Sequence, residues 1–203
     1  TLRAASHGGG GAQLSPPSET RITVRSPDGP RSSGAFKSER PIGVSGSVVL
    51  PSIEGTRPLL VEVQALVSES HLASPRRTTT GVNPNRVSLI LAVLEKRAGV
   101  PFSDKDVFVN VVGGVRVDEP AADLAIAFAL VSSALETPLP ADTAAFGELG
   151  LAGEVRPVDM ARHRVSEAAK FGLTTCVLPR SCAADVNGDA IELIPVTGVA
   201  QAV

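Results

Sequence analysis

The sequence predicts an α/β (α+β) fold in which helices pack on a mixed β-sheet. Three features support this class: a β-hairpin pattern over residues 46–67, helix-type apolar spacing after it, and short apolar runs between the helices. Strands and helices alternate after the hairpin, which is typical of helices covering a sheet. With 203 residues and 43% hydrophobic content, the chain is long enough to bury one sizeable core.

The hairpin is expected within GSVVLPSIEGTRPLLVEVQALV, residues 46–67, with its turn at Glu54-Gly55. Glycine supplies the positive φ that such a turn needs. Every second residue of the second run is apolar, so one face of that strand is expected to be dry. The residues that share this dry face are Val61, Val63 and Ala65.

The sequence before the hairpin has a different composition. Residues 1–43 are rich in Gly, Ser, Pro and Arg and show almost no apolar periodicity, so they are expected to be a low-complexity, flexible leader. Within it, ETRITV at 19–24 has the pattern of a short edge strand. The folded domain is therefore expected to span residues 44–203.

A polar loop is expected over residues 68–85, followed by a helix in RVSLILAVLEKRAG. The apolar residues of this helix recur at helical spacing. Asn83 is the expected N-cap, Pro84 occupies the first turn, and Gly99 stands just past the end.

A buried strand and a second helix follow. The run DVFVNVV, closed by Gly113-Gly114, has the pattern of a strand, and Pro120 is placed to begin a helix capped by Asp118 or Glu119. Helical spacing then predicts which side of that helix is buried. The residues on this side are Leu124, Phe128, Val131 and Leu135.

The remaining elements are shorter. Residues 144–158 are expected to hold two short strands around turns at Gly150 and Gly153. A third helix is expected over 159–171, ending at Gly172, and strands are expected in TTCVLP and AIELIPV.

Composition excludes several functional classes. The net charge of −2 points to no partner, and no apolar run of membrane-spanning length or secretory signal is present, so a cytoplasmic protein without membrane contact is expected. Cys176, Cys182 and His163 are too few for a structural zinc site, so no metal is expected. With 3% aromatic residues and no Trp or Tyr, base-stacking platforms are not expected.

Four segments together resemble a known family. EGTRPLLVEVQALV, SPRRTTTGVNPNR, DVFVNVVGGVRVDEPAADLA and FGELGLAGEVRPV closely resemble the C-terminal domain of the bacterial RadA (Sms) DNA repair family. The match runs from about Val44 to the end of the chain. Because that domain is similar in fold to the proteolytic domain of Lon protease, the resemblance implies a Lon-like fold.

The resemblance also locates two positions at which Lon-type peptidases carry their catalytic serine and lysine. In this chain the serine position is Ala121 and the lysine position is Arg162. Alanine has no attacking oxygen, and a guanidinium stays protonated and cannot act as the base. A non-catalytic, degenerate peptidase fold is therefore expected.

Other reactive residues in this part of the chain are given structural roles. Ser132, Ser133 and His163 are interpreted as packed or solvated residues. The acidic side chains at the start of the second helix are interpreted as favourable partners of the helix dipole rather than as an acid/base pair. These acidic residues are Asp118, Glu119 and Asp123.

Arg76, Arg77 and Arg86 are the candidate DNA-binding residues, because no acidic residue lies between Glu69 and Glu95. Composition alone favours a solvated loop. The RadA resemblance implies instead a DNA-binding, hexamer-forming platform beneath a RecA-like ATPase, acting on single-stranded or branched DNA with a RecA-type recombinase. Weaker candidates, which could instead form ion pairs between subunits, are Arg57 and Arg116.

The chain also departs from the family. It contains no GxxxxGK[ST] motif, so no cofactor is expected here, and ATP and zinc are expected in the N-terminal part of a full-length relative. Residues 5–34 resemble nothing in the family, which suggests a gene fragment with a local frameshift. Two alternative functions stay open: an active Lon-like ATP-dependent serine peptidase, and the Lon-like domain of a magnesium-chelatase-like AAA+ protein.

Overall fold

A computed structural model describes residues 43–186 and 190–203. The expected edge strand at 19–24, and all of the expected leader except Gly43, lie outside the described residues. The strands of the main sheet are β1 (Ser47–Glu54), β2 (Arg57–Glu69), β3 (Arg77–Thr80), β4 (Lys105–Val111), β5 (Thr143–Ala145), β8 (Thr175–Pro179) and β9 (Glu192–Val196). A second, two-stranded sheet consists of β6 (Glu148–Leu149) and β7 (Val155–Arg156).

The main sheet is mixed, with the strand order β3-β4-β2-β1-β5-β8-β9. The β1–β2 and β2–β4 pairs are antiparallel, whereas the other four pairs are parallel. The helical elements are α2 (Pro84–Val93), the π-helical turn η1 (Leu94–Ala98), the 3₁₀ turn η2 (Pro120–Ala122), α3 (Asp123–Ala134), α4 (Ala161–Lys170), α5 (Arg180–Ala183) and α6 (Val199–Ala202). This arrangement confirms the predicted α/β class.

The predicted hairpin, β1 and β2, lies in the middle of the main sheet. Gly55 has a φ of 62° at the turn, and Glu54 pairs with Arg57 across it. Strand β2 pairs with β1 along its first half and with β4 along its second half, and the two ladders overlap at Val63 and Gln64. By contrast, β1 joins β5 through the single registered pair Val49 and Ala144.

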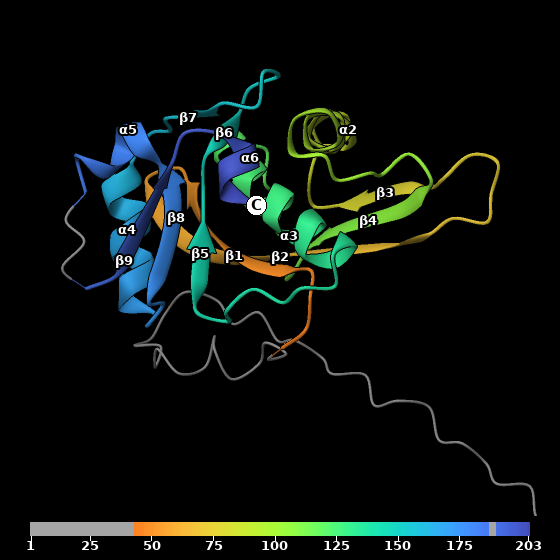
Figure 1. Ribbon diagram of the computed structural model, residues 1–203. Coiled ribbons are helices and arrows are strands. Elements are labelled where there is room, and N and C mark those ends of the chain that lie inside the picture. Colours follow the sequence, from red (N-terminus) through yellow and green to blue (C-terminus); the bar gives the residue numbers. More distant parts are fainter. Residues whose placement is uncertain (1–42, 187–189) are drawn as a thin grey trace, which may run out of the picture.

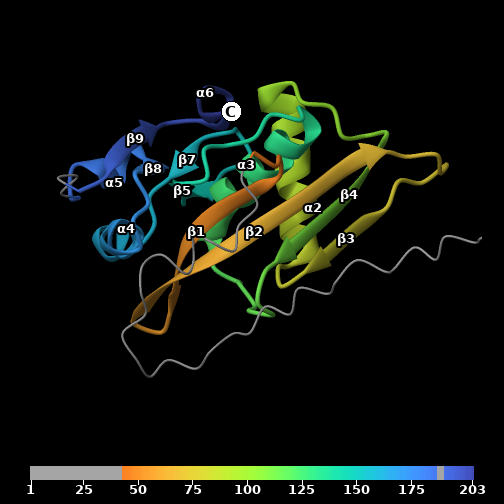
Figure 2. The same cartoon turned by 90° about the horizontal axis from the view of Figure 1, so that it is seen from below.

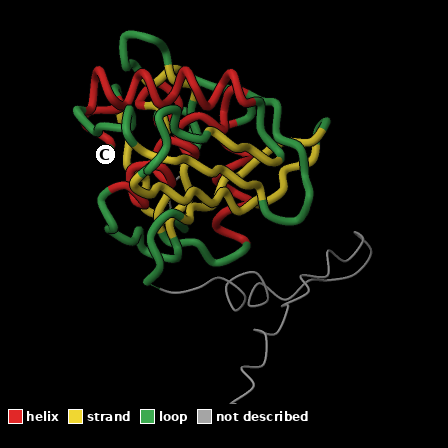
Figure 3. Tube along the Cα trace, turned by 90° about the vertical axis from the view of Figure 1, so that its right-hand side faces the viewer, coloured by secondary structure: helices red, strands yellow, loops and turns green. Residues whose placement is uncertain are grey.

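Helices cover both sides of the sheet. Helices α2 and α3 lie together on one face, and α4 lies on the other side of β1, beside β8 (Figures 1 and 2). Figure 3 shows a long helical run above the strands, which form the middle of the molecule. Strand β1 is therefore buried on both faces from Ser47 to Ser52. The exposed end of the sheet is formed by β3 and the last residues of β2, whereas β4 is mostly buried.

Helix α2 begins and ends as predicted. The Asn83 side chain accepts a hydrogen bond from the Asn85 backbone N–H at 2.9 Å, and Pro84 lies in the first turn. The helix widens into the π-helical turn η1 and stops at Gly99, whose φ of 72° is left-handed. These caps satisfy backbone groups that a helix end leaves unpaired.

Helix α3 is buried on nearly all sides, not on one stripe. Ser132 and Ser133 are buried, and their Oγ atoms accept hydrogen bonds from the backbone N–H groups of Gly46 and Val67, each at 2.9 Å. This confirms that the serines are packed. The prediction that Leu135 is buried is wrong: it lies beyond the last turn and is 57% exposed.

Several short elements were not predicted. Residues 77–80, expected to be part of a polar loop, form the edge strand β3, which pairs in parallel with β4. The short elements β5, α5 and α6 were also missed. Each has five residues or fewer, too short for a period to be read from the sequence.

Candidate functional site

The loop that starts helix α3 is tied to the sheet through Gly147. The Gly147 N–H donates to the Ala121 carbonyl at 2.8 Å, and the Leu124 N–H donates to the Gly147 carbonyl at 3.0 Å. Ala121 is only 2% exposed. The position that the Lon resemblance gives to a nucleophile therefore holds a buried methyl group.

The expected side-chain cap at this helix start is absent. Pro120 does occupy the first turn, but no side-chain capping hydrogen bond is made at Glu119. Its Oε1 instead accepts from Ser52 Oγ at 2.6 Å and from the Ile53 N–H at 3.1 Å. Glu119 is thus the N-cap residue by position, as predicted, but its carboxylate makes no capping hydrogen bond because it is directed to strand β1 and helix α4.

The main partner of Glu119 is Arg164, on α4. Arg164 Nη2 donates to Glu119 Oε2 at 2.6 Å, and Nη1 donates to the Pro51 carbonyl at 2.8 Å. Only 4% of the Arg164 side chain is exposed, and its guanidinium lies 5.8 Å from the centre of the Phe146 ring. Burial raises the pKa of Glu119, but the hydrogen bonds from Arg164 and Ser52 outweigh it and hold the pKa below its usual range.

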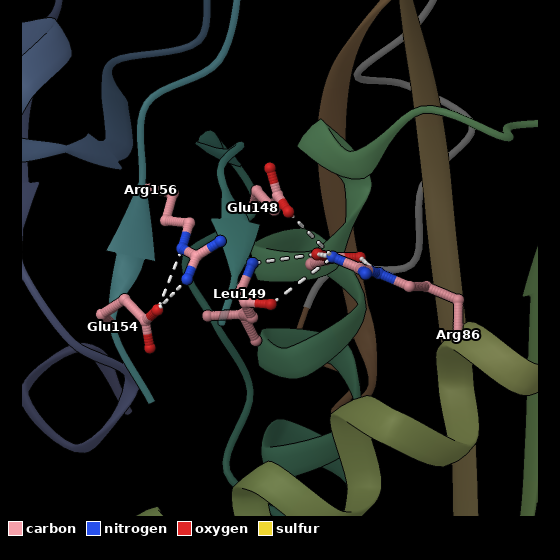
Figure 4. A network of polar contacts seen from close by, with 6 residues as sticks. Arg86, Glu148, Leu149, Glu154 and Arg156 are labelled. Atoms are coloured by element: carbon pink, nitrogen blue, oxygen red, sulfur yellow. Dashed lines mark hydrogen bonds and ion pairs between the residues drawn. The ribbon is translucent and has the colours of Figure 1, made fainter. Parts of the chain in front are cut away.

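A second ion pair joins α2 to α3. Arg86 Nε donates to Asp123 Oδ1 at 2.7 Å, and its Nη2 contacts Asp123 Oδ2. The Leu149 N–H donates to the same Oδ2 at 2.9 Å, and Arg86 Nη2 reaches the Leu149 carbonyl at 3.4 Å (Figure 4). Burial raises the pKa of Asp123, and the hydrogen bond from Arg86 opposes this rise.

The three acids at the helix start therefore all pair with arginine. Asp118 Oδ2 accepts from Arg116 Nε at 2.7 Å on the surface. Glu119 pairs with Arg164 and Asp123 with Arg86. Their interaction with the helix dipole stays a prediction, and the structure adds cationic partners from α4 for Glu119 and from α2 for Asp123.

Arg162 does not face the start of α3. It is exposed on α4, and its Nε donates to the Asp185 carbonyl at 3.1 Å. Its neighbour His163 is also exposed. The buried arginine of this helix is Arg164, which the sequence analysis did not single out.

A sequence signal for Arg164 exists. Ala161, Val165 and Ala168 are the buried apolar residues of α4, and Arg164 falls at the same helical spacing among them. A charged residue on an apolar helix face indicates a buried ionic partner. The identity of that partner, Glu119, could not be read from the helix.

Arg76 and Arg77 lie at the start of β3, and Arg86 lies beyond its other end, so the three arginines do not form one cluster. Arg76 is 63% exposed, with its Nε 3.4 Å from Asp106 Oδ2. Arg77 Nη2 donates to the Phe102 carbonyl at 2.6 Å. The local excess of positive charge is reduced because β3 pairs with β4, which carries Asp106.

Two open clefts flank the start of α3. One, of about 450 Å³, lies between α2 and the β6–β7 turn. It is lined by Arg86, Leu89, Ile90, Val93, Glu148 and Leu151, among others. The other, of about 390 Å³, lies beside Val82, Val117 and Ile126. In both clefts the charged groups nearest the helix start are already paired.

Among residues 43–186 and 190–203, no group of His, Cys, Asp or Glu side chains is arranged to hold a metal ion. Cys176 and Cys182 are buried free thiols, and burial raises the pKa of Cys176 to about 12. No helix in the described part of the chain is long and apolar enough to cross a membrane.

Comparison with known proteins gives one family model and several close relatives. The model described as ChlI, subunit ChlI of Mg-chelatase, matches residues 64–182. The DNA repair protein RadA of Escherichia coli is 52% identical over 155 residues, which cover 76% of this chain and 33% of that protein.

Two further relatives have the same printed name. The DNA repair protein RadA of Pseudomonas aeruginosa is 48% identical over 170 residues, which cover 84% of this chain and 38% of that protein. That of Bacillus subtilis is 47% identical over 171 residues, which cover 82% and 37%. The matched part of the chain thus spans little more than a third of the length of these relatives.

Proposed function

Because the chain belongs to the family described as subunit ChlI of Mg-chelatase and contains a RadA-family region, we propose that it is the non-catalytic DNA-binding and oligomerisation domain of a RadA-type recombinational DNA repair protein. The proposed fold is Lon-protease-like and the proposed assembly is a hexamer in the cytoplasm. Its DNA would be single-stranded or branched, and its partner a RecA-type recombinase. ATP and zinc would be bound by other parts of a longer protein.

The non-catalytic assignment is supported by the side chains at the start of α3, none of which can act as a nucleophile or base for peptide hydrolysis. Ala121 provides no hydroxyl, and Glu119 and Asp123 are held by arginines whose guanidinium groups cannot accept a proton. Arg162, at the expected lysine position, is turned to Asp185. A serine–lysine dyad therefore has neither of its groups at this place.

The peptidase alternative is tested with a serine-directed phosphonate probe and with casein. We expect no covalent adduct and no casein turnover, also when a RadA-type ATPase is present. Turnover that persists in an Ala121→Gly variant would reveal a nucleophile elsewhere in the chain, and it would overturn the proposal.

The proposed DNA surface centres on Arg76. This arginine is exposed and only partly balanced by Asp106, whereas Arg77 is anchored to backbone carbonyls and Arg86 to Asp123. Guanidinium groups bind phosphate oxygens without reading sequence. The proposed binding is therefore weakly sequence-dependent and is weakened by salt.

DNA binding is tested by fluorescence anisotropy with a single-stranded oligonucleotide at several salt concentrations. The Arg76→Ala, Arg77→Ala double variant should lose binding and show a shallower salt dependence. Arg156→Ala is the control, because Arg156 is also exposed and ion-paired, with Glu154, but is not a candidate DNA-binding residue. Equal affinity of the double variant and the wild type would refute the proposed surface.

The magnesium-chelatase alternative is supported by one specific observation, the match of residues 64–182 to the ChlI model. The identity of about half to proteins named RadA supports the repair assignment. Co-purification from cells separates the two, since a RadA-type protein is expected with DNA repair proteins and a chelatase-like protein with other AAA+ subunits.

A further inference from the structure

We infer that the sheet binds single-stranded DNA by stacking an unpaired base on Phe108, in the middle of β4. The inference rests on the DNA-binding part of the proposed function and deepens it, because it adds a contact to a base to the phosphate contact proposed for Arg76. The low aromatic content predicted no platform of several rings, and this inference requires one ring only.

Phe108 lies on the side of β4 that the helices leave open. Its neighbours Val107 and Val109 are buried towards α2 and α3, and side chains alternate along a strand, so Phe108 faces the opposite side. It is partly exposed there. Figure 2 shows β2, β4 and β3 in front of α2, whereas α4 lies over β1, away from β3 and β4. No helix of the described part of the chain covers this side of β4.

The strand register places Phe108 at the centre of a row across three strands. It pairs with Leu66 of β2 on one side and with Thr78 of β3 on the other. Leu66 is 61% exposed, and Thr78 is also exposed. A flat ring between these two side chains offers one of its sides to a ligand. We call these three residues, with Asn110 and Thr80, the open face.

Polar groups flank the ring on the same side of the sheet. Asn110 and Thr80 are paired in register, are exposed and lie two residues further along their strands, about 7 Å away. An amide and a hydroxyl both donate and accept hydrogen bonds, so they can pair with the edge of any base. An aromatic ring beside such groups is suited to hold an unpaired base without reading a fixed sequence.

The charges around the open face favour stacking over electrostatic attraction. Arg76 lies at its edge, but Asp106 is 3.4 Å from it and Asp104 is close in sequence. Glu62, on the neighbouring strand β2, is a further acid and is buried. Attraction of phosphate groups by Arg76 alone is therefore weak, and a stacked base supplies the additional affinity that binding needs.

The composition of the open face selects its occupant. Leu66 and Phe108 are its only apolar side chains, which is too little for the apolar centre of a protein–protein interface. In duplex DNA the bases are already paired and stacked on one another, so their flat sides cannot reach the ring. Single-stranded DNA offers unpaired bases and fits both observations.

The test compares two oligonucleotides of equal length on the full chain by fluorescence anisotropy. One is oligothymidine, and the other is abasic, so it keeps the phosphates but has no bases. Wild type should bind oligothymidine about fivefold or more tightly than the abasic strand. Phe108→Leu, which keeps an apolar side chain but removes the ring, should bind both with equal affinity. Phe171→Leu is the matched control, because Phe171 is also partly exposed but lies at the end of α4.

Salt separates stacking from phosphate binding. The fold-loss caused by Phe108→Leu should be the same at low and high salt, because a stacked base releases no counterions, whereas the fold-loss caused by Arg76→Ala should shrink as salt rises. An unchanged thermal unfolding midpoint should show that Phe108→Leu is folded.

Phe108→Trp gives a direct reading of the contact. The chain contains no Trp and no Tyr, so the new indole is its only strong fluorophore. Oligothymidine should quench this fluorescence, whereas the abasic strand and a fully paired duplex should not. In Phe171→Trp none of the three should change the signal.

The outcomes distinguish this inference from the proposed function. Wild-type protein that binds neither oligonucleotide would refute the proposed DNA binding itself. Binding of oligothymidine that Phe108→Leu leaves unchanged, or an indole at position 108 that oligothymidine does not quench, would refute stacking and leave the phosphate contact of Arg76 standing.

Discussion

Arg164 Nη2 lies 2.6 Å from Glu119 Oε2, and this contact joins α4 to the start of α3. All three guanidinium nitrogens of Arg164 donate hydrogen bonds, since Nε also reaches the Asp159 carbonyl at 3.0 Å and Nη1 the Pro51 carbonyl. A buried cation whose three nitrogens are all hydrogen-bonded is stable only while its carboxylate partner remains.

Glu119→Gln should therefore destabilise the fold. The substitution keeps the shape of the side chain but leaves the Arg164 charge buried without its counterion, which costs on the order of 3–5 kcal/mol. Urea denaturation followed by circular dichroism measures the loss. Asp118→Asn, which removes an exposed ion pair with Arg116, should cost far less, because solvent screens that pair. Equal losses in the two variants would contradict the structural role of Arg164.

The pH dependence of the same variant follows from the lowered pKa of Glu119. Since the pKa is lower in the folded than in the unfolded protein, Glu119 stabilises the fold above its ordinary pKa of about 4.3, and this stabilisation is lost as pH falls through the folded value. The stability difference between wild type and Glu119→Gln should be constant from about pH 6 to 8 and shrink below about pH 4. A difference that grows on acidification would have the wrong sign.

Asp123→Asn should weaken the junction of α2, α3 and β6. The variant removes the carboxylate that binds Arg86, while Arg86 is partly exposed and can be rehydrated. We expect a loss of about 2–3 kcal/mol, within the range for hydrogen bonds to charged groups. Hydrogen exchange of the Leu149 amide, which donates to Asp123 Oδ2, should accelerate together with this loss. Unchanged protection of that amide would argue against the bridge.

Restoring the two catalytic residue types should not restore peptidase activity. In the double variant Ala121→Ser, Arg162→Lys, the new lysine would start from an exposed site beside Asp185 and would keep an ordinary, high pKa. We expect no cleavage of casein at neutral pH. Measurable turnover would show that α4 can reorient, and that the loss of activity lies in the side chains alone.

Gly46→Ala should destabilise the first strand. A Cβ at this position would lie 2.2 Å from the Ala65 carbonyl oxygen, and its φ of 88° is unfavourable for other residues. The backbone conformation alone accounts for about 1–3 kcal/mol. Gly55→Ala is the control, since it also has a positive φ but has open space around it. A thermal unfolding midpoint of Gly46→Ala equal to that of Gly55→Ala would show that the contact with Ala65 relaxes freely.

The sequence predicted the elements whose signals are local. The turn at Gly55, the Asn83 cap and the end of the helix at Gly99 each depend on residues within a few positions. The local sequence is therefore enough to predict them. The exposure of Leu135 could not be predicted, because helical spacing does not show where the residues packed around the helix end. The strand β3 was missed because its threonines pair with residues of β4 that lie 30 positions further along the chain.

The candidate site was harder to predict for the same reason. The sequence correctly indicates that Ala121 lacks a hydroxyl, but the arginines that fill its surroundings come from α2 and α4. Likewise, the stretch from Glu69 to Glu95 contains no acid, yet β4 brings Asp106 beside Arg76. Charge read along the chain therefore overstates the basic character of this surface. Its binding to DNA stays a prediction.

The single residue pair that connects β1 to β5 divides the sheet into two mechanical units. Strands β1, β2, β3 and β4 form one unit, and β5, β8 and β9 form the other. Arg164 of α4 contacts both, since it hydrogen-bonds to Pro51 of β1 and lies over the ring of Phe146, which follows β5. Pulling on the two ends of the domain should therefore part the sheet at this seam first. The contacts of Arg164 with Pro51 and Phe146 then determine how much force the domain withstands before it unfolds.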